Sequence, residues 1–235
     1  MVTVADELSI ALASELERPS VTDALPSDFN KARFVQNTVA LVSESEQLSR
    51  MPQSKLVPAL LKGAYLGLDF FNKECYAVPY GQQVQFMPSY TGMVKLAKRF
   101  SKRPLTDVYG HVVRDGDEFE SGMEDGREYV RFKPKPFNDG AIVGAFAVAQ
   151  FADGGIKVET MSKMQLDAVK RMSKAQSGTA WKFFADEMYR KACIRRLCKG
   201  IDLDMENVEQ ARIMQAEDEA QEVEVSEVDN PFGDE

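Results

Sequence analysis

The chain has 235 residues, of which 44% are hydrophobic and 28% charged, so it can bury one sizeable core or two small ones. This composition excludes a wholly disordered or fibrous protein. The formal net charge of -8 and the pI near 4.9 would ordinarily argue against a nucleic-acid binder, because phosphates attract Lys and Arg.

The negative charge is confined to the two ends of the chain. Residues 1–30 carry six acids and one base, and residues 201–235 carry thirteen acids and one base, so their net charges are -5 and -12. Residues 31–200 hold 27 bases and 18 acids, a net charge of +9. Since the Debye length is about 8 Å at physiological salt, a partner responds mostly to the local charge. We therefore predict an acidic N-terminal arm (1–30), a basic core (31–200) and an acidic, disordered C-terminal tail (201–235).

Other classes of protein can be set aside. The longest apolar run, residues 141–149, is shorter than the roughly 20 residues of a membrane helix and is typical of a buried strand. The first residues include acids rather than a basic stretch, so no secretory signal is expected. Cys75, Cys193 and Cys198 lack CxxC spacing, which argues against zinc and a disulfide framework. We expect a cytoplasmic protein with no membrane contact.

Two helices are predicted first in chain order. Apolar residues recur at three- and four-residue intervals over 34–42 and over 56–68. Ser27 or Asp28 is the expected N-cap of the first helix, and Ser54 is that of the second.

The period then changes from 3.6 to 2. Alternating residues on either side of Gly81 predict a β-hairpin over 75–87, after which Ser89 is expected to cap a basic helix over 89–100. Further strands are predicted at 106–114, 129–133, 141–151 and 157–161, followed by helices at 162–175 and 179–198. This order predicts an α+β fold, in which a small antiparallel β-sheet and a β-hairpin pack against about five helices.

Catalytic groups are sparse in the sequence. His111 is the one histidine and lies in a predicted strand without a partner motif, which favours a structural role. No glycine-rich phosphate loop occurs, so ATP is not expected to be used. The carboxylates from Asp115 to Glu120 could form the metal cluster of a nuclease, although this Gly-rich, charged run is more typical of a solvated loop. The metal-dependent nuclease is kept as an alternative.

Nucleic-acid binding has stronger support. Residues 157–199 hold eleven bases and four acids, a net charge of +7. On the last predicted helix, Lys191, Arg195 and Lys199 recur every four residues, so they form one stripe that could follow a phosphate backbone. We expect Trp181, Phe184 and Met188 to pack beneath this stripe.

Aromatic residues near the bases could stack on the bases of a single strand. Such stacking contributes about 1 to 3 kcal/mol per base. Because side chains alternate along a strand, only one face of the hairpin can be exposed, and some of these rings must belong to the core. The candidate rings are Tyr76, Tyr80, Phe86 and Tyr90.

Three strings of the chain resemble the RecT family of phage recombinases, which are single-strand annealing proteins. The strings are GLDFFNKECYAVPYG, VQFMPSYTGMVKLAKRF and SGTAWKFFADEMYRKACIRRLCK. The resemblance covers about residues 31–199. Its most specific parts are Gly67-Leu68-Asp69, Tyr80-Gly81, Tyr90-Thr91-Gly92 and the Trp-containing helix that ends in paired arginines.

The resemblance implies pairing of complementary DNA strands without ATP by a homo-oligomer, a ring or a helical filament. Single-stranded DNA and the annealed duplex would be bound in a positive groove. It further implies a partner exonuclease, contact with the host single-strand binding protein, and a phage or prophage origin in a bacterial host. No bond chemistry and no cofactor are expected; no site implies magnesium, whose use stays open. A passive single-strand coating protein is a further alternative.

The predicted DNA contacts combine basic residues of two helices with two aromatic rings that stack or give support. No catalytic or metal-binding residue is predicted. The predicted contacts are Lys95, Lys98, Arg99, Lys182, Arg190, Lys191, Arg195 and Arg196, with Tyr90 and Trp181.

Overall fold

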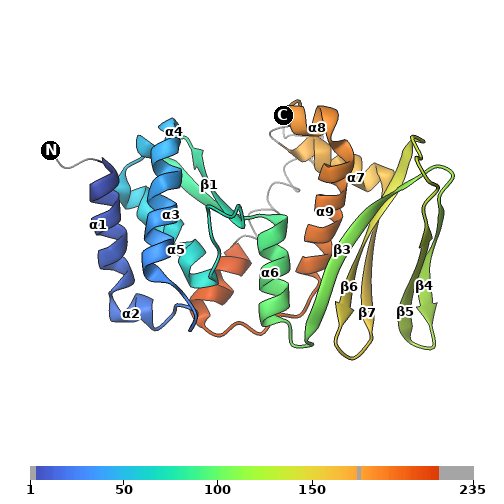
Figure 1. Cartoon of the computed structure of the whole chain (residues 1–235), viewed down its shortest axis with the longest axis horizontal. Coiled ribbons are helices and arrows are strands. Elements are labelled where there is room, and N and C mark those ends of the chain that lie inside the picture. Colours follow the sequence, from blue (N-terminus) through green and yellow to red (C-terminus); the bar gives the residue numbers. More distant parts are fainter. Residues whose placement is uncertain (1–3, 174–175, 217–235) are drawn as a thin grey trace, which may run out of the picture. The chain divides into compact units, whose positions relative to one another are not determined.

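A computed structural model describes residues 4–173 and 176–216. The chain divides into two compact units (Figure 1). Unit 1 contains the described residues up to Gly92 and those from Met205 onward, and unit 2 comprises Met93–Asp204. In the part of the chain that is described, no helix is long and apolar enough to cross a bilayer.

Unit 1 begins with helices, and the first of them lies within the predicted acidic arm. In α1, Leu8, Leu12 and Leu16 recur every four residues and are buried. Their helix packs against α3 and α5, so the start of the chain contributes to the core of unit 1. The helices are α1 (Val4–Leu16), α2 (Pro19–Thr22), α3 (Lys31–Glu44), α4 (Glu46–Ser49) and α5 (Gln53–Leu66).

The predicted helices α3 and α5 are confirmed, but their predicted caps are wrong. The N-cap of α3 is Asn30, whose side chain accepts a hydrogen bond from the Arg33 N–H at 2.9 Å. Pro52 stands at the N-cap of α5, and Ser54 lies inside the first turn. An asparagine directly before the helix caps as well as Ser or Asp, so the choice depends on where the backbone turns.

A tight turn and the predicted hairpin follow α5. Gly67 ends the helix in the left-handed conformation at φ 64, where a side chain would be strained. Asp69 then accepts hydrogen bonds from the Phe71 N–H at 2.8 Å and from the Asn37 side chain at 2.9 Å. Strands β1 (Cys75–Tyr80) and β2 (Gln83–Pro88) pair antiparallel, with Gly81 at φ 55 between them.

The start of helix α6 (Tyr90–Phe100) is fixed by two close contacts. Ser89 caps the helix as predicted, because its hydroxyl oxygen accepts from the Gly92 N–H at 3.1 Å. The Glu74 carbonyl oxygen accepts from the Ser89 N–H at 2.9 Å and would lie 2.0 Å from any Cβ at position 92. Only glycine fits there.

The chain returns to unit 1 in a helix over residues 208–216. Gln210 is buried, and its side chain donates to the Tyr65 carbonyl at 3.0 Å. Asn207 donates likewise to the Ala24 carbonyl at 3.0 Å. The predicted tail is therefore folded as far as residue 216, and its remainder, 217–235, lies outside the described residues.

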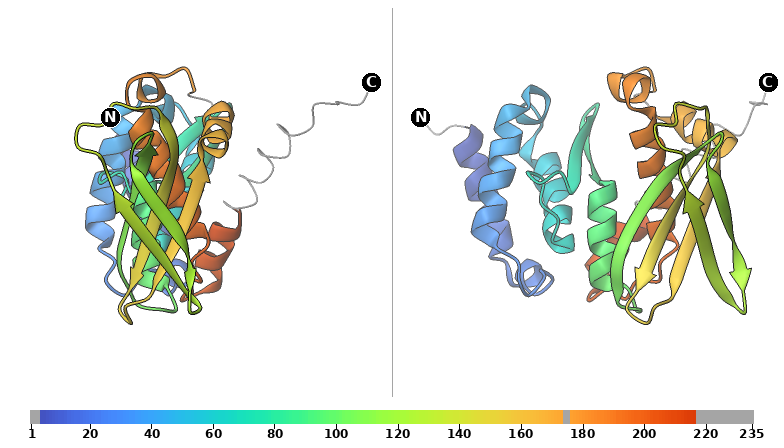
Figure 2. Two further views of the ribbon diagram at one scale, coloured as in Figure 1. Left: turned by 90° about the vertical axis from the view of Figure 1, so that its right-hand side faces the viewer. Right: turned by 45° about the vertical axis from the view of Figure 1, so that its right-hand side comes forward.

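Unit 2 is a sheet covered on both faces. The strand order is β3–β6–β7, all antiparallel, and β4 and β5 form a separate hairpin. Helices α7, α8 and α9 complete the unit (Figure 2). The bounds are β3 (Leu105–Arg114), β4 (Glu118–Glu124), β5 (Arg127–Lys133), β6 (Ile142–Phe151), β7 (Ile156–Ser162), α7 (Lys163–Met172), α8 (Thr179–Phe183) and α9 (Ala185–Lys199).

The central strand β6 alternates large and small residues. Phe146 and Val148 belong to the cluster that the β4–β5 hairpin covers, and the ring centroids of Phe146 and Phe119 are 5.0 Å apart. Alanines occupy the alternate positions, on the face that α9 covers. Gly110 pairs with Ala147, and a Cβ there would lie 3.0 Å from Ile194 of α9. Small side chains on this face allow the helix to approach the sheet closely.

The α+β class with small antiparallel sheets is confirmed. Two segments of unit 2 nevertheless differ from prediction. The acidic run expected as a loop forms β4, whose Glu118 and Glu120 pair across the hairpin with Lys133 and Arg131. The helix predicted over 179–198 is broken at Phe184, where φ is -130 and ψ is 41.

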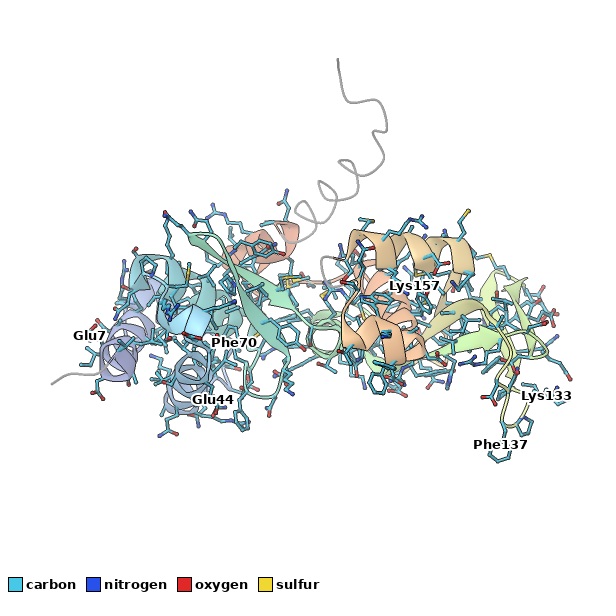
Figure 3. The ribbon with its side chains drawn as sticks, turned by 90° about the horizontal axis from the view of Figure 1, so that it is seen from above. Glu7, Glu44, Phe70, Lys133, Phe137 and Lys157 are labelled. Atoms are coloured by element: carbon cyan, nitrogen blue, oxygen red, sulfur yellow. The ribbon has the colours of Figure 1, made fainter. Side chains whose placement is uncertain are left out.

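The loop after β5 holds Phe137 in the left-handed region at φ 53, with its ring fully exposed (Figure 3). Asn138 fastens this loop by donating to Asp117 at 2.7 Å. Asparagine tolerates left-handed backbone better than phenylalanine, so Phe137→Asn should raise the free energy of unfolding by about 1 kcal/mol. Urea unfolding measures this change. Phe71→Asn, at an exposed position without positive φ, should bring no gain; a loss of stability in Phe137→Asn would contradict the assigned strain.

Candidate nucleic-acid interface

Helix α9 places its basic stripe opposite the face that covers the sheet. Tyr189, Cys193 and Leu197 are buried on that face. Lys191, Arg195 and Lys199 follow at the same four-residue spacing, two positions further on, and therefore lie on another side of the helix. Lys199 is exposed, and the other two are half-buried.

The helical layer of unit 2 carries an excess of positive charge. Over 163–173 and 176–199, the described residues include nine bases and three acids. Each of these acids is already engaged by a donor from its surroundings. Asp167 binds Lys163 at 2.5 Å, Glu187 binds Arg190 at 2.5 Å, and Asp186 pairs with Arg114 of β3.

The hydrogen bond from Lys163 lowers the pKa of Asp167, and the hydroxyl of Tyr189 adds to this by donating at 2.6 Å. The same contact with Asp167 raises the pKa of Lys163. The pair is therefore fully charged near neutral pH. The hydrogen bond from Tyr189 joins this pair on α7 to α9, and the layer as a whole keeps its excess of positive charge.

Two predicted contact residues have structural partners. Arg196 lies with its Nε 3.1 Å from Glu159 of β7, and Arg190 pairs with Glu187. The Nε atom of Arg190 is itself buried and has no hydrogen-bond partner among the described residues. Arg196 thus helps to hold α9 against β7, whereas the pair of Arg190 lies within α9 itself.

The remaining predicted bases lie on α6. Lys98 is 3.3 Å from Asp107 of β3, and the Arg99 guanidinium is 5.3 Å from the centroid of the Phe100 ring. Lys95 is exposed. Tyr90 is half-buried and belongs to unit 1. The structure therefore places the predicted bases in two groups, one on α6 and the other on α8 and α9.

Of the two aromatic residues that were expected to pack beneath the stripe, Trp181 is buried and Phe184 is not. Trp181 is buried, with 4% of its surface exposed; its Nε1 donates to the Ser173 hydroxyl at 3.1 Å and its ring meets Tyr189 edge-on. It supports the junction of α7, α8 and α9. The expectation that Phe184 packs beneath the stripe is wrong, because the helix break turns this ring outward, where it is 60% exposed.

A cavity of about 540 Å³ lies in unit 2, between strand β3, the loop after β5 and the start of α9. Its charged walls are largely paired, since Arg114 binds Asp186 and Arg190 binds Glu187. The lining residues are His111, Val112, Arg114, Asp117, Phe132, Pro134, Lys135, Asn138, Asp186, Glu187 and Arg190.

The carboxylates from Asp115 to Glu120 do not converge. Burial acts to raise the pKa of Asp117, but hydrogen bonds from the Arg114 N–H, the Asn138 side chain and the Lys135 N–H outweigh it and lower that pKa. Glu118 and Glu120 are held by cross-strand ion pairs on the hairpin. Within the described part of the chain, no three His, Cys, Asp or Glu side chains gather as a metal site. The nuclease alternative therefore gains no support from the geometry.

The cysteines have no partner thiol and lie in the core. Burial raises the pKa of Cys193 and of Cys198 to about 12, so both thiols stay protonated at neutral pH. A thiol, rather than a thiolate, is a poor nucleophile and metal ligand. Cys193 and Cys198 therefore act as small apolar side chains on the buried side of α9.

The α+β fold carries a cationic helical layer of the kind that suits an anionic polymer, and the family comparison specifies the class of protein. The model of the RecT family matches residues 32–231, so the chain belongs to the RecT family, whose members are DNA recombination and annealing proteins. Protein RecT of Escherichia coli (strain K12) is 28% identical over 209 residues, which cover 82% of this chain and 76% of that protein. The resemblance inferred from the residues is confirmed.

Proposed function

We propose that this chain binds single-stranded DNA through the basic helical layer of unit 2 and anneals complementary strands without ATP. The observation that carries the proposal is the charge pattern of α7, α8 and α9. Their described residues hold nine bases, while their three acids are all engaged by neighbouring donors. The layer therefore keeps an excess of positive charge, which attracts phosphates.

Annealing follows physically from such binding. A surface that neutralises the phosphates of one strand lowers its repulsion for a second strand. Contacts to phosphates and base faces leave the Watson–Crick edges open to test pairing. The duplex is then stabilised by its own stacking, so no bond is made or broken and no nucleotide is hydrolysed.

The finer parts of the proposal rest on family membership. We infer that the chain acts as a homo-oligomer, a ring or a helical filament, in the cytoplasm of a bacterial host. An exonuclease that produces single strands and the host single-strand binding protein are the proposed partners. Magnesium is not required by any residue of the proposed surface.

An annealing assay without ATP tests the function. Two complementary labelled oligonucleotides are mixed with the whole protein, with and without magnesium, and duplex formation and strand length are followed on gels. Faster duplex formation at constant strand length is expected. Binding without acceleration would instead indicate a passive coating protein, and shortening of the strands that needs magnesium would indicate the nuclease.

A further inference from the structure

Two neighbouring phenylalanines form an exposed aromatic pair at the junction of α8 and α9. Phe183 is 66% exposed and Phe184 60% exposed. Single apolar residues on a surface are ordinary, but two consecutive phenylalanines that are both exposed are unusual within a strongly charged region. They lie in the same unit as the basic layer.

The backbone beneath the pair is held firmly. Helix α8 ends at Phe183, and the Phe184 N–H donates to the Ala180 carbonyl at 2.9 Å. The Phe184 carbonyl in turn accepts from the Met188 N–H at 3.1 Å, which starts α9. Buried Trp181 anchors α8 from the other side through Ser173. The rings are therefore exposed on a fixed support, which reduces the entropy lost when a ligand stacks on them.

One cation lies beside the pair, and two more lie on α7 of the same basic layer. The Lys182 ammonium lies 5.2 Å from the centroid of the Phe183 ring, and the Lys170 ammonium lies 6.0 Å from that of Trp181. Arg171 follows Lys170 on α7 and is exposed. Among the described residues, these three bases have no carboxylate within ion-pair distance. Lysine is depleted at protein–protein interfaces, whereas exposed rings beside cations suit a nucleic acid with its anionic backbone and flat bases.

We propose that Phe183 and Phe184 are the base-stacking pair of the single-strand site, and that Lys170, Arg171 and Lys182 contact the adjoining phosphates. The assignment rests on the proposed function and deepens it, because it names where the bases lie. Trp181, one of the aromatic candidates from the sequence, takes the supporting role beneath them. Stacking on a ring is tolerant of base identity, as annealing of arbitrary sequences requires.

Leucine substitutions separate stacking from apolar contact. Phe183→Leu with Phe184→Leu keeps apolar bulk but removes both π-faces, and should weaken binding of a labelled single strand roughly tenfold or more. The slope of log affinity against log salt should stay unchanged, because no charge is lost. Phe183→Tyr with Phe184→Tyr keeps both faces and should bind as the unaltered protein does. Fluorescence anisotropy at several salt concentrations supplies both quantities.

The matched control is Phe71→Leu, which alters a ring that is 64% exposed in unit 1, next to Asp69 and Glu74. This variant should bind DNA normally. Circular dichroism and the emission of Trp181, the one tryptophan, verify that each variant is folded.

Three results would overturn the assignment. The first is wild-type affinity in the leucine pair, and the second is equal loss in the tyrosine and leucine pairs. The third is a change of oligomer mass in the leucine pair without DNA, which would make the rings a contact between copies of this chain. If the unaltered protein neither binds nor anneals single strands, the proposed function fails and the stacking pair with it; failure of the leucine test alone leaves the proposed function standing.

Discussion

Gly92→Ala is expected to lower the free energy of unfolding by about 3 kcal/mol or more. The added Cβ would stand 2.0 Å from the Glu74 carbonyl oxygen, which also accepts from the Ser89 N–H. To relieve this clash, the first turn of α6 would have to move away from the loop before β1. That movement would break the hydrogen bond between the Ser89 N–H and the Glu74 carbonyl. Urea unfolding followed by circular dichroism measures the loss.

Gly81→Ala provides the comparison for this prediction. Gly81 has φ 55, but no atom lies within 4 Å of a Cβ built there. Alanine should therefore cost about 1 to 2 kcal/mol of backbone strain without a clash. If Gly92→Ala proves no less stable than Gly81→Ala, the close approach of Glu74 to α6 is not as described.

Replacing the stripe residues Lys191, Arg195 and Lys199 together by alanine is expected to weaken single-strand binding at low salt by at least tenfold. Each lost phosphate contact should lower the slope of log affinity against log salt by about 0.7, so the three together should lower it by about 2. Arg196 is left unchanged in this variant, because its loss would leave Glu159 of β7 without its ion pair.

Three arginines of unit 1 give a control with the same change in net charge. Arg18, Arg50 and Arg212 each pair with an acid three or four residues away on their own segment. Their joint replacement by alanine should leave the salt slope near its original value. An equal drop in both triple variants would mean that overall charge governs binding, and the stripe would lose its special role.

Features that depend on residues close together in the chain could be predicted from the sequence. The hairpin around Gly81 and the cap at Ser89 depend on residues close in the chain, and both are confirmed. The run over 141–149 was predicted to be a buried strand, and β6 is buried because both faces of its sheet are covered. Which face of β6 meets which element could not be predicted, because that depends on the register of the sheet. In the structure the alanines face α9 and Phe146 faces the β4–β5 hairpin.

Two of the elements that the sequence did not predict, α1 and β4, were missed for different reasons. Leu8, Leu12 and Leu16 have helical spacing, but the acids of this segment favoured an acidic arm over a packed helix. Strand β4 has almost no apolar alternation beyond Phe119, so its sequence does not look like a strand. It is stabilised instead by ion pairs of Glu118 and its neighbours with residues of β5. A pattern of charges that pair only across a hairpin cannot be interpreted from one strand alone.

The motifs that carried the family resemblance have architectural roles in this structure. Gly67 ends α5, Asp69 ties its turn to α3, Gly92 admits the Glu74 carbonyl and Trp181 anchors α8. The exposed Phe183 could not be chosen from sequence, because helical periodicity runs on through the break. The acids Asp186 and Glu187 were the available signal, since acids are typical of a helix start.

The connections at the boundary of unit 2 give it the character of an insertion. The Asp204 N–H donates to the Phe100 carbonyl at 2.7 Å, and Ser101 bridges Leu203, so the chain leaves unit 2 beside the point where it entered. Unit 1 is consequently assembled from both flanking pieces, including the helix at 208–216 with buried Ile213. A cut meant to remove the acidic tail belongs after residue 216. A truncation after Leu203 would also remove the helix at 208–216 from unit 1. Any change in DNA binding would then reflect the damaged packing of unit 1 rather than the loss of the acidic tail.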